Sequence, residues 1–364
     1  MTRTTNGTVL HHPRFTAEER LLFACTTPRM TDEQARRIVA ALGGAACDWE
    51  LVFKVAIEHG VCPLVYRHLR RLAGAGLDVP RPILMRLKLA QFEKIEEKER
   101  ARRMLRDVLA FFNSHDMPVM LVKGAALDAV VHEEPWHTTS LDIDVLIRPR
   151  AEEIPDDLRE QVWHFNRTGP FECDFHEHHD LNIDGVLPVD FEAIWRAARR
   201  IEYLGHAVYV MSPVDMLIAA CTSSCRKRYF TLKSLYGIRE IVRRLGPFDP
   251  PTIVERAATH DCQAIVYTAL SAARLTVGCP IDDAVLQQLA VRVGRRQLID
   301  FLAARLSFSP LARRVGFRSG GGAAASVINR AKWDSSLLLP FASYRSYQVL
   351  RRVGWLARNR GKNQ

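Results

Sequence analysis

The sequence lacks closely paired cysteines and long apolar runs. Its eight cysteines are scattered and form no CxxC pair. Structural zinc sites and disulfide frameworks draw on cysteines at close, repeated spacings, so we expect buried free thiols instead. No apolar run approaches the ~20 residues that a transmembrane helix needs. The first twenty residues also lack the apolar stretch of a signal peptide, which predicts a cytoplasmic protein.

The short motifs of three large enzyme classes are also missing. The sequence contains no GxSxG, no HExxH and no GxxxxGK[ST]. These absences argue against a serine hydrolase, a zinc protease and a P-loop ATPase.

Acidic residues are scarce at one end of the chain only. From Leu311 onward there are 11 lysines and arginines and one acid, Asp334, although the whole chain carries a net charge of only +10. Residues 341–360 would form an amphipathic helix in which aromatic and basic residues alternate. Three interpretations of this tail stay open: a helix docked on the protein body, a nucleic-acid contact, or a contact with an anionic membrane.

Helical patterns flank a region whose sequence predicts strands as well as helices. Residues 1–15 are predicted to be disordered, and 16–115 to form a helical domain with N-caps at Thr16, Thr31 and Asp48. Its last stretch reads as one long helix with packed ends and a solvated, highly charged centre. Residues 212–310 predict a second helical domain, and 311–364 a basic linker and tail.

The intervening residues 116–211 predict a small α+β core. PVMLVKG reads as a buried strand, AALDAVVHEE as a helix and LDIDVLIRP as a second strand. HHDLNIDGVLPVDFEAIW reads as a hairpin with Asp184-Gly185 at its turn. The predicted fold class is therefore α+β, with a small mixed sheet between N-terminal and C-terminal helical domains.

The LDIDVLI strand carries the most informative pair of residues. Side chains alternate faces along a strand, so Asp142 and Asp144 share one face while apolar residues occupy the other. Carboxylate oxygens are the ligands that Mg²⁺ prefers. A third carboxylate on an adjacent strand would complete a two-metal site, and Asp190 and Glu192 are again two residues apart. The pattern predicts a metal site for phosphoryl or nucleotidyl transfer.

The turn after the first predicted strand suits a polyphosphate. The backbone N–H groups at a helix N-terminus bind anions, and Gly124 would let the backbone approach a triphosphate. Lys123 adds a positive charge beside them.

The order LVKGAAL, LDIDVLI, VDFEAIW resembles the bacterial nucleotidyltransferase-like proteins of the polymerase-β-type superfamily. DWELVFKVAIEHGVCPLVYRHL and SPVDMLIAACTSSCRKRYFTLKSLYGIREIV resemble that family's flanking helices, so the resemblance covers about residues 45–245. It implies a catalytic, metal-binding set consisting of Asp142, Asp144 and Asp190. It implies a nucleotide-binding set consisting of Lys123, Gly124, Ser140, Arg226, Lys227 and Lys233.

Two further residues are candidate substrate contacts. Glu192 follows the third carboxylate, and His178 belongs to FECDFHEHHDLNID. The Cys and His residues of that segment would suit zinc chemically, but adjacent histidines point to opposite sides of a strand, so we favour a substrate contact over a metal site.

The sequence departs from the family pattern at three points. Thr138, Thr139 and Ser140 occupy the stretch where an arginine is often found, and Glu192 stands where histidine is common. Gly237 lies near a position where an acid is expected.

The resulting hypothesis is transfer of a nucleoside monophosphate from an NTP, ATP being favoured, to an acceptor hydroxyl with Mg²⁺ or Mn²⁺ as cofactor. The acceptor is open among a small molecule, a peptide or protein, and RNA. One alternative is a weak or inactive member that binds nucleotide or protein, which the departures favour. The other is an RNA- or tRNA-modifying transferase that uses the basic tail.

Overall fold

The computed structural model describes residues 15–138, 142–148, 153–168, 171–175, 181, 187–226, 231–289 and 291. The predicted tail, 311–364, and residues 1–14 therefore lie outside the described residues. Phe15, which lies in the segment predicted to be disordered, is buried and packs against Phe23 with ring centroids 5.0 Å apart.

Helices with well-defined caps form the N-terminal part of the protein. The Thr16 hydroxyl and the Glu19 carboxylate accept each other's backbone N–H in a capping box, and Thr31 and Gln34 do the same. Asp48 accepts from the N–H of Leu51. The three predicted N-caps are thus confirmed. The helices are α2 (Ala17–Cys25), α3 (Asp32–Leu42), α4 (Trp49–Glu58) and α5 (Cys62–Gly74).

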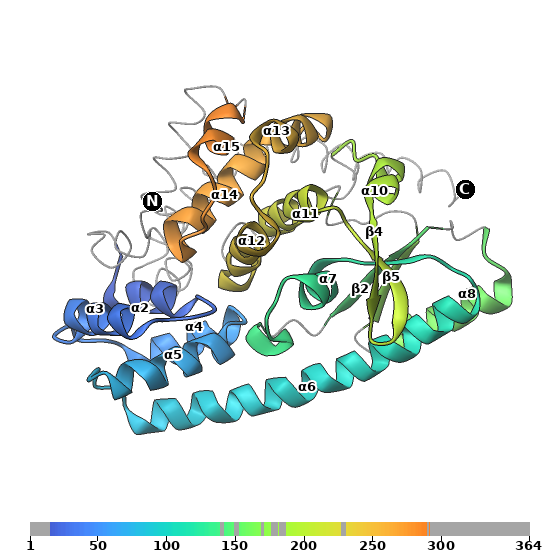
Figure 1. Ribbon diagram of the computed structural model, residues 1–364. Helices are drawn as coiled ribbons and strands as arrows, with labels where there is room; N and C mark the ends of the chain where they lie inside the picture. The colour runs from blue at the N-terminus through green and yellow to red at the C-terminus, as the bar shows by residue number, and fades with distance from the viewer. Residues whose placement is uncertain are drawn as a thin grey trace, which may run out of the picture.

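Helix α6 (Arg81–Ser114) is the longest helix that the structure describes, with 34 residues, and it runs along one edge of the molecule (Figure 1). Of residues 91–100 in its centre, only Lys98 is buried, so the predicted solvated centre holds except at this residue. Lys98, in the middle of α6, is 5% exposed, and its Nζ lies 2.5 Å from an oxygen of Asp128. Asp128 also contacts His132 Nδ1 at 3.0 Å. A buried charge needs a partner, so this ion pair lets a charged residue face inward.

A five-stranded mixed sheet forms the core, in the order β3-β2-β1-β5-β4. β1 pairs antiparallel with β2 and parallel with β5, β2 pairs parallel with β3, and β4 pairs antiparallel with β5. The elements of this region are β1 (Val119–Leu121), α7 (Lys123–Val130), η1 (Pro135–His137), β2 (Ile143–Ile147), α8 (Asp156–Thr168), β3 (Phe171–Phe175), α10 (Phe191–Ala197), β4 (Arg199–Tyr203) and β5 (His206–Val210). The predicted α+β fold class is confirmed.

The hairpin of the sheet lies downstream of the predicted one. Leu204 and Gly205 connect β4 to β5, with φ angles of 53° and 82°. Two consecutive positive φ angles are typical of the tight turn that best matches strand twist. The predicted arm around Asp190 is helical instead, and residues 182–186, including Asp184-Gly185, lie outside the described residues.

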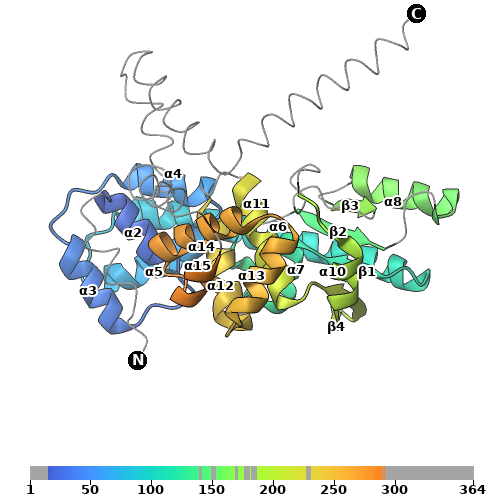
Figure 2. The same cartoon turned by 90° about the horizontal axis from the view of Figure 1, so that it is seen from above.

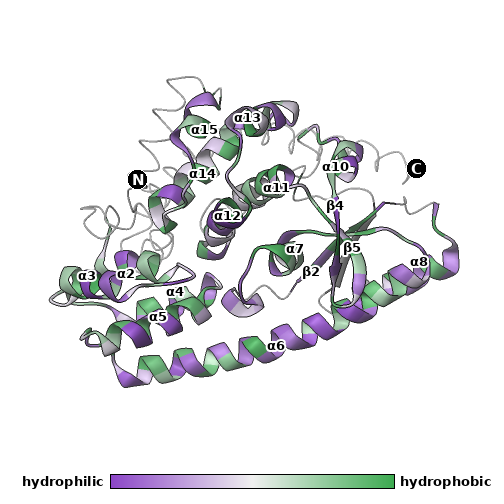
Figure 3. Ribbon diagram, viewed as in Figure 1, coloured by the Kyte–Doolittle hydropathy of each residue, from purple (hydrophilic) through white to green (hydrophobic). Residues whose placement is uncertain are grey.

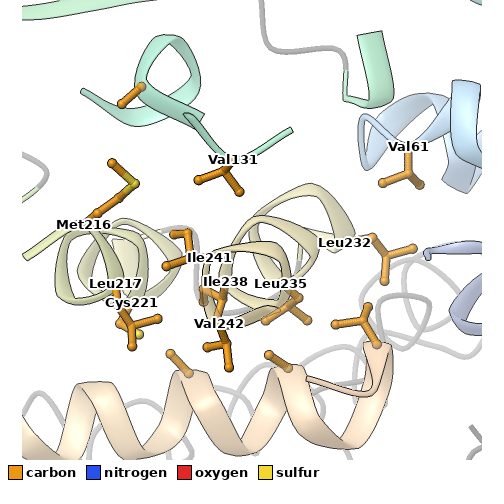
Figure 4. Packing of buried hydrophobic residues seen from close by; sticks show 14 of the residues in the cluster. Val61, Val131, Met216, Leu217, Cys221, Leu232, Leu235, Ile238, Ile241 and Val242 are labelled. Atoms are coloured by element: carbon orange, nitrogen blue, oxygen red, sulfur yellow. The ribbon is translucent and has the colours of Figure 1, made fainter. Parts of the chain in front are cut away.

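The C-terminal helices pack between the N-terminal helices and the sheet (Figures 1 and 2). Leu235, Ile238 and Val242 of α12 (Leu232–Leu245) point toward α14 (Gln263–Val277), the pale orange helix at the bottom of Figure 4. Asp261, with a φ of 49°, separates a helix that ends at Thr259 from one that begins at Gln263. The helices are α11 (Pro213–Arg226), α12 (Leu232–Leu245), α13 (Pro250–Thr259), α14 (Gln263–Val277) and α15 (Asp283–Gln288).

Buried apolar residues from all three parts form one continuous cluster, from Phe15 to Leu289. Among the described helices, none is both long enough and apolar enough to cross a bilayer.

Substitution Lys98→Met should destabilise the protein by about 3–5 kcal/mol, because it leaves the Asp128 carboxylate buried without its cation. Urea denaturation would measure the free energy of unfolding. The double variant Lys98→Met/Asp128→Asn should recover part of the loss. Arg100→Ala is the matched control on α6, because its pair with Glu96 is exposed and should contribute less than about 1 kcal/mol. Equal losses in the Lys98 and Arg100 variants would contradict this account.

Candidate active site at the start of strand β2

The turn between β1 and α7 brings Lys123 to the beginning of β2. The β1–β2 ladder pairs Leu121 with Val145, and the N–H of Val122 donates to the carbonyl oxygen of Asp144 at 3.2 Å. Lys123 follows with a φ of 48°, in the left-handed region that residues other than glycine seldom adopt. Strained backbone of this kind is concentrated at functional sites, where the surrounding structure over-determines it.

Asp144 is a buried carboxylate inside the sheet. It is 5% exposed, and all five residues of β2 are buried. Lys123 Nζ lies 2.5 Å from Asp144 Oδ1, while the lysine side chain itself stays 23% exposed. The ammonium group thus compensates a charge that burial would otherwise destabilise.

Asp142 lies just before β2 and is exposed. Residues two apart on an extended chain share a face, so Asp142 offers a solvent-facing carboxylate on the Asp144 side of the strand. The predicted opposite-face residues Ile143, Val145 and Ile147 are buried. Leu146 is buried as well, so the strand is covered on both faces.

The N-terminus of α7 lies at the same place as Asp144. We call the group of Lys123, Gly124, Asp142 and Asp144 the corner. Lys123 and Gly124 are half-buried, and Ala125 and Ala126 behind them are buried. The N–H groups of a first helical turn have no intrahelical acceptor and carry partial positive charge. The structure therefore brings together a lysine, a helix N-terminus and two carboxylates.

This donor set fits a single Mg²⁺. Mg²⁺ typically binds through one or two carboxylates and completes its shell with water and substrate phosphates. Asp142 and Asp144 supply that number of hard oxygen ligands. Within the described ranges, no three His, Cys, Asp or Glu side chains gather closely enough to hold a metal.

The prediction that Asp190 lies on an adjacent strand was wrong. Asp190 is the N-cap of α10: its Oδ1 accepts from the N–H of Ala193 at 2.9 Å, and Arg196 lies 3.9 Å away. Pro188 cannot donate a hydrogen bond to a strand neighbour, whereas Asp is a preferred N-cap. Burial of Ile194 and Trp195 then stabilises the helix.

Glu192 is likewise in the first turn of α10. Its Oε2 lies 3.6 Å from Arg148, which directly follows the far end of β2 from Asp144. Among the described contacts, neither Glu192 nor Asp190 touches Asp142, Asp144 or Lys123.

The other predicted nucleotide-binding residues are placed only in part. Lys233 lies in the first turn of α12, and its N–H donates to the carbonyl oxygen of His59 at 3.2 Å. Ser140, Lys227 and His178, and the side chain of Arg226, lie outside the described residues.

Sequence reasoning missed a buried polar network just upstream of the aspartates. Arg67 Nη1 lies 3.2 Å from His137 Nε2, and Tyr236 Oη lies 3.1 Å from His137 Nδ1. A guanidinium only donates, so Nε2 accepts and the proton of the neutral imidazole sits on Nδ1. These residues are 70 and 99 positions apart in sequence, so no local pattern could reveal their contact.

Burial, followed by the charge of Arg67, lowers the pKa of His137 to about 3. The histidine is therefore neutral in the folded protein at neutral pH. It connects α5, η1 and α12.

The family comparison agrees with this geometry. The chain matches the uncharacterised nucleotidyltransferase family over residues 45–278 and belongs to that family. A search of curated proteins and a search of solved structures each returned no match. The match includes the β1–α7 turn, both aspartates and the flanking helices through α14.

The neutral His137 predicts acid sensitivity. Its folded pKa of about 3 lies below the ordinary value of 6.5, so the stability it contributes is complete above pH 6.5 and is lost as pH falls toward 3. The free energy of unfolding therefore changes with pH, and each such histidine contributes at most about 1.4 kcal/mol per pH unit to that change.

The slope is measured by urea denaturation at several pH values between 7 and 4, where His137→Gln should flatten it by about one proton. His115→Gln is the control, because His115 is exposed on the surface. An unchanged slope in the His137 variant would show that the ring is not buried as a neutral group.

Proposed function

We propose that the chain transfers a nucleoside monophosphate from an NTP to an acceptor hydroxyl. The observation that carries the proposal is the Lys123–Asp144 pair at 2.5 Å, beside the exposed Asp142 at a helix N-terminus. Membership of the nucleotidyltransferase family supports the general reaction. Mg²⁺ or Mn²⁺ as cofactor, ATP as the favoured NTP and the nature of the acceptor are parts of the proposal.

Each residue of the corner has a defined task. Asp142 and Asp144 would hold the divalent ion, and Gly124 and the N–H groups of α7 would receive phosphate oxygens. Lys123 pairs with Asp144, and its ammonium group would be available to a triphosphate if that carboxylate held a divalent ion. When bound, Mg²⁺ neutralises charge on the phosphates and lowers the pKa of the acceptor hydroxyl.

In the reaction, the acceptor oxygen bonds to the α-phosphorus as the bond from that phosphorus to the bridging oxygen breaks. Pyrophosphate leaves, and the hydroxyl proton passes to a base. The family resemblance assigns Asp190 to this step. Asp190 caps α10 and, among the described contacts, touches none of Asp142, Asp144 and Lys123, so we assign nucleotide binding to the corner without Asp190.

A second candidate is a nucleotide-binding module without turnover. The ion pair favours it, because Lys123 already occupies one oxygen of Asp144. A second observation also favours a binding module: within the described ranges, no third acid joins Asp142 and Asp144 in a group that could hold a metal. Pyrophosphate release in the presence of an acceptor distinguishes the two functions, since only the transferase produces it.

Titration calorimetry with each NTP, with Mg²⁺ or with excess EDTA, tests the site. Wild type should bind one NTP in Mg²⁺, and EDTA should abolish binding. Asp142→Asn should weaken binding at least ~10-fold by removing a metal ligand, and Asp144→Asn should do the same.

Asp190→Asn is the matched control, because asparagine caps a helix as well as aspartate does and only the charge is lost. It should leave NTP affinity unchanged. Failure of wild type to bind any NTP would refute both candidate functions, and a loss in the Asp190 variant equal to that in Asp142→Asn would place the site elsewhere.

A further inference from the structure

An apolar stripe lies on the outer face of α6. Met85 is 55% exposed, Leu89 58% and Phe92 55%. Their spacing of four and three residues puts them on one side of the helix. Among the described residues, Trp163 is the other large apolar side chain with comparable exposure, and it is isolated on α8. Clustered exposed apolar residues mark interaction sites, whereas single ones are ordinary.

The opposite face of α6 is already covered. It packs against α4, α5, η1 and β5, and it contains the fully buried residues Leu87, Val108, Leu109 and Phe112. Figure 1 shows α6 at the lower edge of the molecule, and Figure 3 shows hydrophilic and hydrophobic residues interspersed along it. The three residues of the stripe therefore do not take part in the packing of the core.

The charges beside the stripe identify its partner. At 100° per residue, Arg81 and Glu99 lie on one flank of the stripe, and Arg86 and Glu93 lie on the other. The basic member precedes the stripe's centre and the acidic member follows it on each flank. An antiparallel copy of the same helix therefore presents acids where this one presents bases.

We propose that the stripe is the contact of a homodimer in which two α6 helices pack antiparallel across a two-fold axis near Leu89. Met85 then lies opposite Phe92 of the partner subunit, and Leu89 lies opposite the partner's Leu89. Flanking pairs form between Arg81 and the partner's Glu99 and between Arg86 and the partner's Glu93. A two-fold axis makes every such contact twice, as isologous interfaces require.

Existing contacts do not oppose this arrangement. Arg86 lies 4.0 Å from the Phe53 ring centroid and pairs with Glu50, yet its side chain remains 43% exposed. Glu99 is 46% exposed, with Arg102 3.9 Å away. A contact limited to one helix is smaller than the ~1,600 Å² typical of stable complexes, so the dimer should be reversible and depend on concentration.

Sedimentation velocity of the full chain over a concentration series tests the proposal. Wild type should shift from monomer to dimer, and Leu89→Glu should raise the dissociation constant at least ~10-fold. Leu89 is exposed, so the variant should fold normally. Trp163→Ser is the matched control, because it removes an equally exposed apolar side chain outside the stripe and should leave association unchanged.

A charge swap tests the antiparallel register. Arg81→Glu alone, or Glu99→Arg alone, places like charges opposite each other and should weaken the dimer several-fold. The double variant should restore it. The two residues are 18 positions apart, about 27 Å along one helix, so rescue can come only from contact between copies.

Each contrary result overturns the proposal. A wild-type monomer at all concentrations would mean that another segment or a different protein covers the stripe. A dimer that Leu89→Glu does not weaken would use another surface. A double variant as weak as the single variants would rule out the antiparallel register.

Discussion

Burial of the Asp144 carboxylate inside the sheet is the constraint around which the molecule is arranged. A charge at that position is tolerated only with a cation in contact, and Lys123 supplies it at 2.5 Å. To reach it, the chain leaves β1 with a left-handed residue and enters α7 at once. The same conformation places the α7 N-terminus beside the two aspartates. The strain and the buried charge thus occur at one place, the proposed nucleotide site.

The surrounding helices keep this corner in position. Lys98 anchors α7 to the long helix α6 through Asp128, and Gly237 lets α12 approach α7 so closely that a Cβ there would lie 3.1 Å from Leu127 Cδ1. His137, held by Arg67 and Tyr236, links η1 to α5 and α12. The glycine that departs from the family pattern therefore has a packing role. Helical domains on both sides are needed because α7 and β2 are short.

Local patterns predicted the three N-caps, the strand that carries Asp144 and the helix that begins at Lys123. They failed where tertiary contacts decided the outcome. Asp190 could belong to a strand or a cap, and the apolar residues Ile194 and Trp195 packed as a helix. Lys98 looked solvated because its partner lies 30 residues away on another helix. The β4–β5 hairpin carried a usable signal, Leu204-Gly205 between alternating residues, which sequence reasoning overlooked.

The most direct test of the central claim is a crystal structure of the protein with Mn²⁺ and a non-hydrolysable NTP analogue. Anomalous scattering would locate the ion independently of the surrounding density. The account predicts the ion at the Asp142 and Asp144 carboxylates, phosphates at the α7 N-terminus, and Lys123 Nζ shifted from Asp144 to a phosphate oxygen. An intact Lys123–Asp144 pair with the nucleotide bound elsewhere would contradict it.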